Sequence, residues 1–202
     1  MDFEEINKLF NIRKTVIEML QDRNYIIPSS ENISFDEFSI KYKNKNIDIF
    51  IDNATNIGDK VFVYFHNENK TISKVDLKNL LNRIIETYQD EEIQLIILLK
   101  EKGNGSILKE ITKEIYKNVE IFMNKNMIFN ITHHDFVHKH IILSKEETDE
   151  VLDKYSTTLS KLPKILKNDP VAKYYGMKEN QVCKIIRKSP EVGNYIYYRL
   201  VK

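Results

Sequence analysis

The spacing of hydrophobic residues along the first half of the chain predicts several helices. In residues 4–24 they recur every three or four positions, which is the period of an amphipathic helix. A second, short helix is expected to follow Ser34, because Glu37 stands three residues later, at the capping-box position. The same helical period returns in residues 75–88 and 107–116.

Strands are expected between these helices. Residues 47–51 alternate between isoleucine and polar side chains, as in a strand that is buried on one face. Residues 61–66 are apolar throughout, which is typical of a strand in the middle of a sheet. Residues 93–99 are expected to form a buried strand and residues 119–123 a further strand. The predicted order is α-α-β-β-α-β-α-β, so we expect a layered α/β domain in which helices cover a mixed sheet.

The pattern changes near Asn130, and we expect a first domain over residues 1–130 and a second over 131–202. In the second domain, Pro163 favours an extended conformation for Leu162. Asn168 or Asp169 can then cap a short helix.

That helix is expected to start at Pro170, where a missing N–H costs nothing, and to end at Gly176 in a left-handed C-cap. Residues 181–187 are rich in β-branched side chains and residues 195–201 read as another strand. Ser189, Pro190 and Gly193 mark the turn between them. The second domain is therefore expected to be a small α+β module, and the fold class of the whole chain α/β (α+β).

Composition narrows the class of protein. The chain has 202 residues, of which 42% are hydrophobic and 30% charged, as in a soluble globular protein. Its net charge of +1 gives no general attraction to nucleic acid. The single cysteine, Cys183, excludes a disulfide framework, and its apolar neighbours suggest a small buried side chain. We expect no signal peptide and no membrane contact, because the longest apolar run, residues 95–99, is too short to span a bilayer.

Two patterns could indicate metal chemistry. His133, His134, His138 and His140 lie close together, but the carboxylate or cysteine pattern of a zinc site does not accompany them. We therefore expect neither a metal nor another cofactor at these histidines.

The second pattern is an Asp…Glu-x-Lys spacing, in which Asp48 or Asp52 precedes Glu68 and Lys70. Metal-dependent nucleases use such carboxylates to bind Mg²⁺ and the lysine to position water. A nuclease that uses Asp52, Glu68 and Lys70 is accordingly an alternative function. The composition around Glu68 favours a solvated turn instead.

A basic loop could contact DNA. Gly103 and Gly105 follow a predicted strand and precede a predicted helix. Lys100, Lys102 and Ser106 lie around them, where side chains and free backbone N–H groups could meet a phosphate.

The end of the chain combines tyrosines with arginines, which suits either a platform for stacking single-stranded bases or a protein interface. Tyr174, Tyr175 and Tyr198 cannot all be covered by so small a domain, so a protein partner is the favoured explanation. A free-standing nucleic-acid-binding module remains a further alternative.

Several motifs, in order, resemble one known family. They are Leu162-Pro163-Lys164-Ile165, Asp169-Pro170-Val171-Ala172, Tyr174-Tyr175-Gly176, Val182 to Arg187, and Tyr195 with Tyr198-Arg199. Upstream, Asn130 to His134 and His140 to Ser144 continue the match, and Ile12 to Val16 with Asp22 to Tyr25 match near the start. The chain resembles the fifth subunit of eukaryotic-type multisubunit DNA-directed RNA polymerases, a family that also includes the corresponding small archaeal polymerase subunit.

The resemblance implies a non-catalytic subunit, whose first domain forms part of the jaw near downstream DNA and whose second domain docks on the largest subunit. The catalytic aspartates would lie in that partner. The residues that it assigns to partner binding are Leu162, Pro163, Asp169, Pro170, Tyr174, Tyr175, Gly176, Arg187, Tyr195, Tyr198 and Arg199. Lys100, Lys102 and Ser106 are the candidates for DNA contact.

The expected location is the nucleus if the protein is cellular. Lysine and isoleucine are abundant and alanine is rare, which indicates an A/T-rich genome. If that genome belongs to a large DNA virus, the expected location is the virion or the infected host cell.

Overall fold

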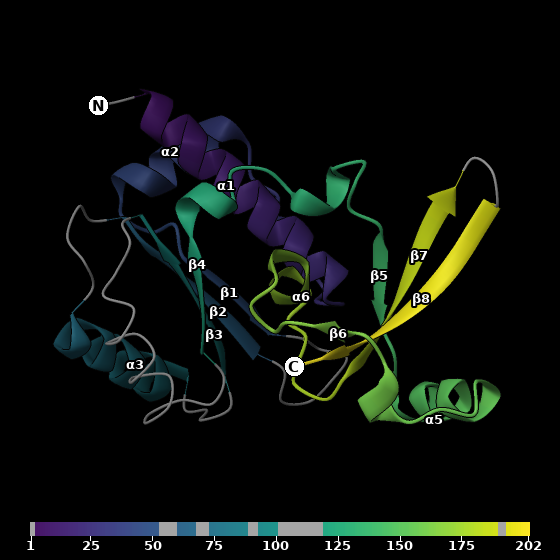
Figure 1. Cartoon of the computed structure of the whole chain (residues 1–202). Coiled ribbons are helices and arrows are strands. Elements are labelled where there is room, and N and C mark those ends of the chain that lie inside the picture. Colours follow the sequence, from purple (N-terminus) through teal and green to yellow (C-terminus); the bar gives the residue numbers. More distant parts are fainter. Residues whose placement is uncertain (1–2, 53–59, 68–72, 89–92, 101–118, 190–192) are drawn as a thin grey trace. The chain divides into compact units, whose positions relative to one another are not determined.

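The computed structural model divides the chain into two compact units, Met1–Phe129 and Asn130–Lys202. The structure describes residues 3–52, 60–67, 73–88, 93–100, 119–189 and 193–202. Each unit contains a four-stranded sheet of its own (Figure 1).

The N-terminal unit begins with the expected amphipathic helix, α1, over Phe3–Asp22. Its buried side chains include Ile6, Leu9 and Val16. A 3₁₀ turn, η1 (Ser29–Glu31), leads to the second helix, α2 (Phe35–Lys43). The predicted capping box is confirmed. The Glu37 backbone N–H donates to the Ser34 hydroxyl (3.3 Å), and the Ser34 backbone N–H donates to the Glu37 carboxylate (2.7 Å).

Four strands form the mixed sheet that the sequence predicts. They are β1 (Ile49–Asp52), β2 (Lys60–His66), β3 (Gln94–Leu99) and β4 (Val119–Met123). The strands follow one another in that order across the sheet. β1 pairs with β2 antiparallel, whereas β2 with β3 and β3 with β4 are parallel. The apolar strands β2 and β3 therefore lie inside the sheet, as expected.

Helices lie on both sides of this sheet (Figure 1). Helix α3 (Lys74–Tyr88) packs Leu77, Leu80 and Ile84 against alternate side chains of β3. Figure 1 shows α1 on the opposite side, and both faces of β3 are buried in consequence. This explains why β3 is apolar at five of its six positions rather than alternating. The helix predicted over residues 107–116 lies outside the described residues.

The C-terminal unit contains a second four-stranded sheet. Its elements are η3 (Ile131–His133), β5 (Lys139–Ile142), α5 (Lys145–Lys154), η4 (Leu159–Lys161), β6 (Lys164–Ile165), α6 (Pro170–Tyr174), β7 (Val182–Ser189) and β8 (Gly193–Val201). The strand order across the sheet is β5-β7-β8-β6. β5 and β8 pair with β7 antiparallel, and β6 pairs with β8 parallel. This sheet carries its own core, which includes Ile165, Ala172, Met177, Cys183 and Val201.

Local signals in the sequence set the helix α6. The Asp169 side chain accepts a hydrogen bond from Val171 N (2.9 Å), so Asp169 rather than Asn168 is the cap. Pro170 occupies the first turn. Gly176 has a φ of +63°, which confirms the left-handed position predicted for it.

Helix α5 is one element that the sequence patterns above did not predict. A capping box starts it, in which Glu147 N donates to the Ser144 hydroxyl (3.1 Å) and Ser144 N donates to the Glu147 carboxylate (2.8 Å). The Ser-x-x-Glu spacing was therefore a usable signal. None of the helices in the described ranges is long and apolar enough to cross a membrane.

Because each unit has its own core, we predict that residues 130–202 fold without the rest of the chain. Cys183 is fully buried, and burial raises the pKa of its thiol, so the folded fragment should protect it from alkylation. Circular dichroism and the rate of thiol labelling, with and without urea, measure both properties. A fragment that labels at the unfolded rate in buffer, while the whole chain is protected, would contradict the predicted domain boundary.

Candidate functional site

A groove of about 350 Å³ opens on one face of the C-terminal sheet. The segment before β5 and β5 itself supply Phe136, Val137, His138 and His140. The remaining lining residues come from β6 to β8 and the start of α6, and they are Ile165, Asp169, Val171, Ile185, Arg187, Tyr197 and Arg199. The groove thus combines an apolar floor with two arginines and one aspartate.

The pleat of β7 and β8 brings these side chains together. The register pairs Ile185 with Tyr197 and Cys183 with Arg199. Directly opposed residues share a face of the sheet, and alternate residues of one strand share that face too. Tyr195, Tyr197 and Arg199 therefore point to the groove side of β8.

The Arg187 side chain is held in place by its neighbours on that face. Its Nη1 donates a hydrogen bond to the Tyr197 hydroxyl (3.4 Å), and its guanidinium carbon lies 5.7 Å from the centre of the Tyr195 ring. The Tyr195 and Tyr197 rings meet edge to face at 4.8 Å. Such contacts orient the planar guanidinium before any partner arrives.

The groove has a net positive charge near neutral pH. Two guanidinium groups, of Arg187 and Arg199, face one carboxylate, of Asp169, which leaves one excess positive charge. His140 does not change this balance, because burial lowers the pKa of its imidazole. Its Nδ1 lies 2.7 Å from the His138 carbonyl oxygen.

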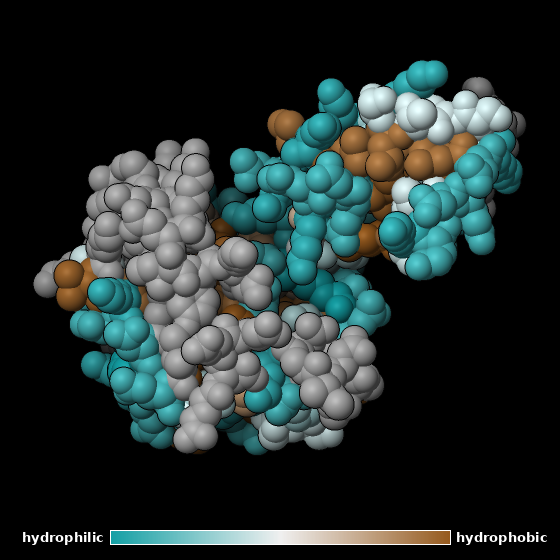
Figure 2. Space-filling model, turned by 90° about the horizontal axis from the view of Figure 1, so that it is seen from below, coloured by the Kyte–Doolittle hydropathy of each residue, from teal (hydrophilic) through white to brown (hydrophobic). Residues whose placement is uncertain are grey.

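Several hydrophobic side chains are exposed on the C-terminal unit, two of them at the groove. Figure 2 shows hydrophobic surface on the C-terminal unit, at the right of the view. Among the described residues of this unit, the large hydrophobic side chains that are exposed are Phe136, Tyr155, Leu159, Leu166, Ile196 and Tyr197. Phe136, at 86% exposure, has the most exposed side chain of the set, and it lines the groove.

The structure brings only some of the predicted partner-binding residues into this groove. Asp169, Arg187 and Arg199 line it. Leu162 and Tyr198 instead pack with the Leu143, Val182 and Leu200 cluster. The Tyr198 ring also lies 5.9 Å from the Tyr155 ring, on the face of β8 that points away from the groove.

Tyr174, one of the predicted partner-binding residues, lies inside the unit. Its side chain is only 2% exposed, and its hydroxyl accepts a hydrogen bond from Asn130 Nδ2 (2.8 Å). The Tyr175 ring packs edge to face on it at 5.2 Å. Tyr174 cannot contact a partner in this structure, because the short helix α6 turns it into the unit's own interior. Pro163 and Pro170 are exposed, and Tyr175 and Gly176 are partly buried.

Phe136, His138 and Tyr197 line the groove but were not among the predicted site residues. Tyr197 had a signal, since it stands two positions before Arg199 in a predicted strand and must share its face. No sequence signal pointed to Phe136 and His138, because these residues reach the groove only through the pairing of β5 with β7.

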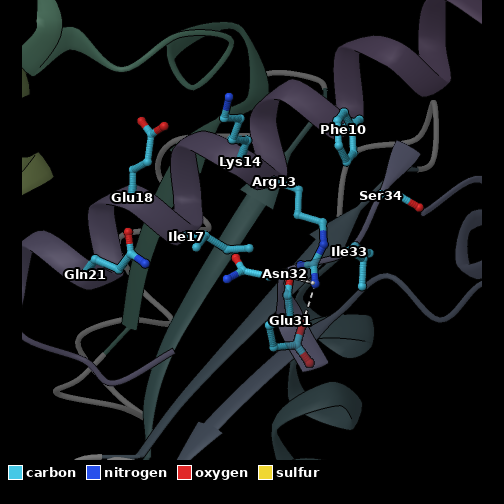
Figure 3. Close-up of a pocket in the computed structure, with 10 residues that line it drawn as sticks. All are labelled: Phe10, Arg13, Lys14, Ile17, Glu18, Gln21, Glu31, Asn32, Ile33 and Ser34. Carbon is cyan, nitrogen blue, oxygen red and sulfur yellow. Dashed lines mark hydrogen bonds and ion pairs between the residues drawn. The ribbon is translucent and has the colours of Figure 1, made fainter. Parts of the chain in front are cut away.

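The N-terminal unit has a second groove, of about 470 Å³, between α1 and the segment around η1. Figure 3 shows Arg13 reaching from α1 to Glu31, with which it forms an ion pair. Lys14 and Glu18 also line this groove. Its two basic and two acidic side chains cancel, so this surface offers no charge-based attraction for nucleic acid.

The loop predicted to contact DNA is only partly described. Lys102 and Ser106 lie outside the described residues. Lys100 forms an ion pair with Glu5 of α1, so part of its charge is already neutralised within the chain.

The nuclease alternative finds no support in the described residues. Asp48 accepts a hydrogen bond from Phe65 N (2.9 Å), which is a structural contact within the sheet, and Asp52 is exposed at the end of β1. Glu68 and Lys70 lie outside the described residues. Throughout the described ranges, no three histidine, cysteine or acidic side chains, His133 to His140 included, are grouped to hold a metal.

The C-terminal groove thus combines tyrosine and arginine side chains, which are typical of protein interfaces. Comparison with known proteins shows the family. Residues 3–84 match the family model described as RNA polymerase Rpb5, N-terminal domain, and residues 129–201 match RNA polymerase Rpb5, C-terminal domain.

Whole-length relatives support the same assignment. The chain is 35% identical to the DNA-directed RNA polymerases I, II, and III subunit rpabc1 of Dictyostelium discoideum, over 98% of each chain. It is 31% identical to subunit RPABC1 of Caenorhabditis elegans, over 98% of this chain and 97% of the relative. It is also 28% identical to the DNA-directed RNA polymerase subunit 5-like protein 1 of Arabidopsis thaliana, over 97% and 96%.

The chain therefore belongs to the Rpb5 family, the fifth subunits of eukaryotic-type DNA-directed RNA polymerases. It is an accessory subunit of the transcription machinery and not the catalytic one.

Substitution of Tyr174 tests whether its buried hydroxyl stabilises the C-terminal unit. Tyr174→Phe should lower the free energy of unfolding by about 1–2 kcal/mol, because it leaves the Asn130 amide without this buried acceptor. Tyr197→Phe, at a side chain that is 37% exposed, should change it by less than about 0.5 kcal/mol. Urea unfolding measures both variants. Equal effects would mean that the Asn130–Tyr174 contact does not stabilise the unit.

Proposed function

We propose that the C-terminal unit anchors this subunit on the largest subunit of the polymerase, and that the N-terminal unit forms part of the jaw beside the downstream DNA. The groove of the C-terminal sheet is the observation on which this proposal rests. The names of the eukaryotic relatives also support a nuclear location.

The chemistry of the groove supports a protein partner. Tyrosine and arginine are the side chains that most often anchor protein interfaces, and Arg187, Tyr197 and Arg199 lie together here. Ile165, Val171 and Ile185 provide an apolar floor beneath them. A largest-subunit segment that brings a carboxylate would pair with an arginine while it covers this floor.

The groove is a better protein site than a nucleic-acid site. A stacking platform for single-stranded bases needs aromatic faces within a strongly positive channel. Here Arg187 lies over Tyr195, the tyrosine rings contact each other, and Asp169 offsets one of the two arginines. The free-standing nucleic-acid-binding module is accordingly the weaker candidate.

The proposed DNA contact rests on the loop that includes Lys100, Lys102 and Ser106. Its place after β3 and its two lysines favour contact with phosphates. Because Glu5 pairs with Lys100, Lys102 is expected to contribute more of the attraction.

Docking through the groove predicts that Arg199→Glu weakens binding to the largest subunit about thirtyfold or more, as loss of a central anchor typically does. Arg199 is exposed, so the variant should stay folded. Lys178→Glu makes the same change of charge at an exposed position outside the groove and should bind like the wild-type chain. Coprecipitation at subunit concentrations near the dissociation constant measures the difference.

Two results would contradict the docking proposal. One is wild-type chain that fails to coprecipitate the largest subunit. The other is an equal loss of binding in both charge-reversal variants, which would show a general effect of charge and not a site.

The DNA contact predicts a change in salt dependence of the assembled polymerase. Lys102→Ala should lower the slope of log K against log[salt] by about one, because one phosphate contact is lost. Lys100→Ala should lower it by less, because Glu5 already neutralises part of the Lys100 charge in the wild-type chain. DNA-binding titrations at several salt concentrations measure these slopes. Unchanged slopes in both variants and in their combination would remove this loop from the DNA interface.

A further inference from the structure

Strand β8 has a long edge that the described residues leave unpaired. β7 pairs with β8 at every position from Gly193 to Leu200. On the other side, β6 pairs with β8 only at Leu200 and Val201. Within the described residues, the outer edge of β8 over positions 194–199 has no neighbouring strand.

The backbone hydrogen bonds show which groups face this edge. Val201 N donates toward the β7 side, to the Gln181 carbonyl (2.9 Å). Leu200 N donates in the opposite direction, to the Pro163 carbonyl (2.8 Å). Successive residues of a strand direct their N–H and C=O groups to opposite edges. The backbone groups of Ile196 and Tyr198 therefore point to the open edge.

An exposed strand edge is a template for another strand, and proteins usually blunt it with charges, proline or a bulge. Positions 194–199 contain one charged residue, Arg199, and no proline. Ile196 is 45% exposed and Tyr197 37% exposed, on opposite faces of the strand. This edge has the properties of one that is covered by another chain in the assembled protein.

Charge indicates which chain covers it. On the groove side, β7 and β8 carry two basic residues, Arg187 and Arg199, and no acidic residue. Edge-to-edge pairing of two copies would bring these like charges together, whereas an acidic segment would complement them.

We propose that an extended acidic segment of a partner polymerase subunit adds as a strand to the outer edge of β8. This inference rests on the proposed docking function and extends it from a groove to a specific mode of binding. Acidic and apolar side chains are expected to alternate along this segment. Its acidic side chains lie on the groove side, beside Arg199, and its apolar side chains lie on the other side, beside Ile196 and Tyr198.

The direction of the Ile196 N–H allows a test with a matched control. Ile196→Pro removes a donor that faces the partner but takes no part in the ladder with β7, so the fold should survive, as for proline on edge strands. Ile196→Val keeps both the N–H and the β-branched shape. We expect Ile196→Pro to weaken coprecipitation of the largest subunit about tenfold and Ile196→Val to leave it nearly unchanged. Circular dichroism of both variants checks their folding.

Amide hydrogen exchange on the wild-type chain gives an answer even if the proline variant unfolds. The amides of Ile196 and Tyr198 should exchange at least about tenfold more slowly in the assembled polymerase than in the free chain. Unchanged exchange at both amides would overturn strand addition.

The outcomes separate this inference from the docking proposal. If Arg199→Glu loses binding while Ile196→Pro binds like the wild-type chain, docking through the groove is right and strand addition is wrong. If the free chain is a dimer by light scattering and those amides are protected in the dimer, a second copy covers the edge instead. If the wild-type chain binds no largest subunit, the docking proposal itself fails.

Discussion

The antiparallel pairing of β7 with β8 is the constraint on which the rest of the C-terminal unit depends. Its register places Ile185 opposite Tyr197 and Cys183 opposite Arg199. Because side chains alternate along a strand, a slip of one residue in this pairing would turn Tyr197 and Arg199 of β8 to the face opposite Arg187 of β7. It would also separate Cys183 and Ile185 of β7 from Val201 of β8, which share one core cluster. The same strand pairing therefore determines the positions of both the core side chains and the groove side chains.

Certain basic side chains of the two units have different kinds of partner, which supports different roles for them. In the N-terminal unit, Arg13 pairs with Glu31 and Lys100 pairs with Glu5, so these two basic side chains are neutralised within the chain. In the C-terminal unit, Arg187 contacts tyrosines instead of a carboxylate. Such guanidinium groups keep their capacity to bind carboxylates elsewhere, which is how docking surfaces acquire specificity.

Much of the fold could be predicted from the sequence because its signals are local. The capping box at Ser34, the turn at Gly176 and the apolar runs of β2 and β3 each act over a few residues. The site was harder to predict, because it depends on contacts between residues that lie far apart in the sequence. The Tyr174 hydroxyl accepts a hydrogen bond from Asn130, 44 positions away, and Lys100 forms an ion pair with Glu5, 95 positions away. Aromatic content alone could not separate the buried Tyr174 from the exposed Tyr197, although strand alternation places Tyr197 beside Arg199.

Site-directed cross-linking tests the central claim, docking through the C-terminal groove, most directly. A photoreactive phenylalanine analogue replaces Phe136, which is 86% exposed at the groove, in chain assembled into the polymerase. The same analogue at Phe3 of α1, which is 67% exposed, serves as the matched control. Docking through the groove predicts that the probe at position 136 forms a cross-link to the largest subunit. If the probe at position 136 forms no cross-link in the fully assembled enzyme, or cross-links only to other subunits, docking through the groove is contradicted.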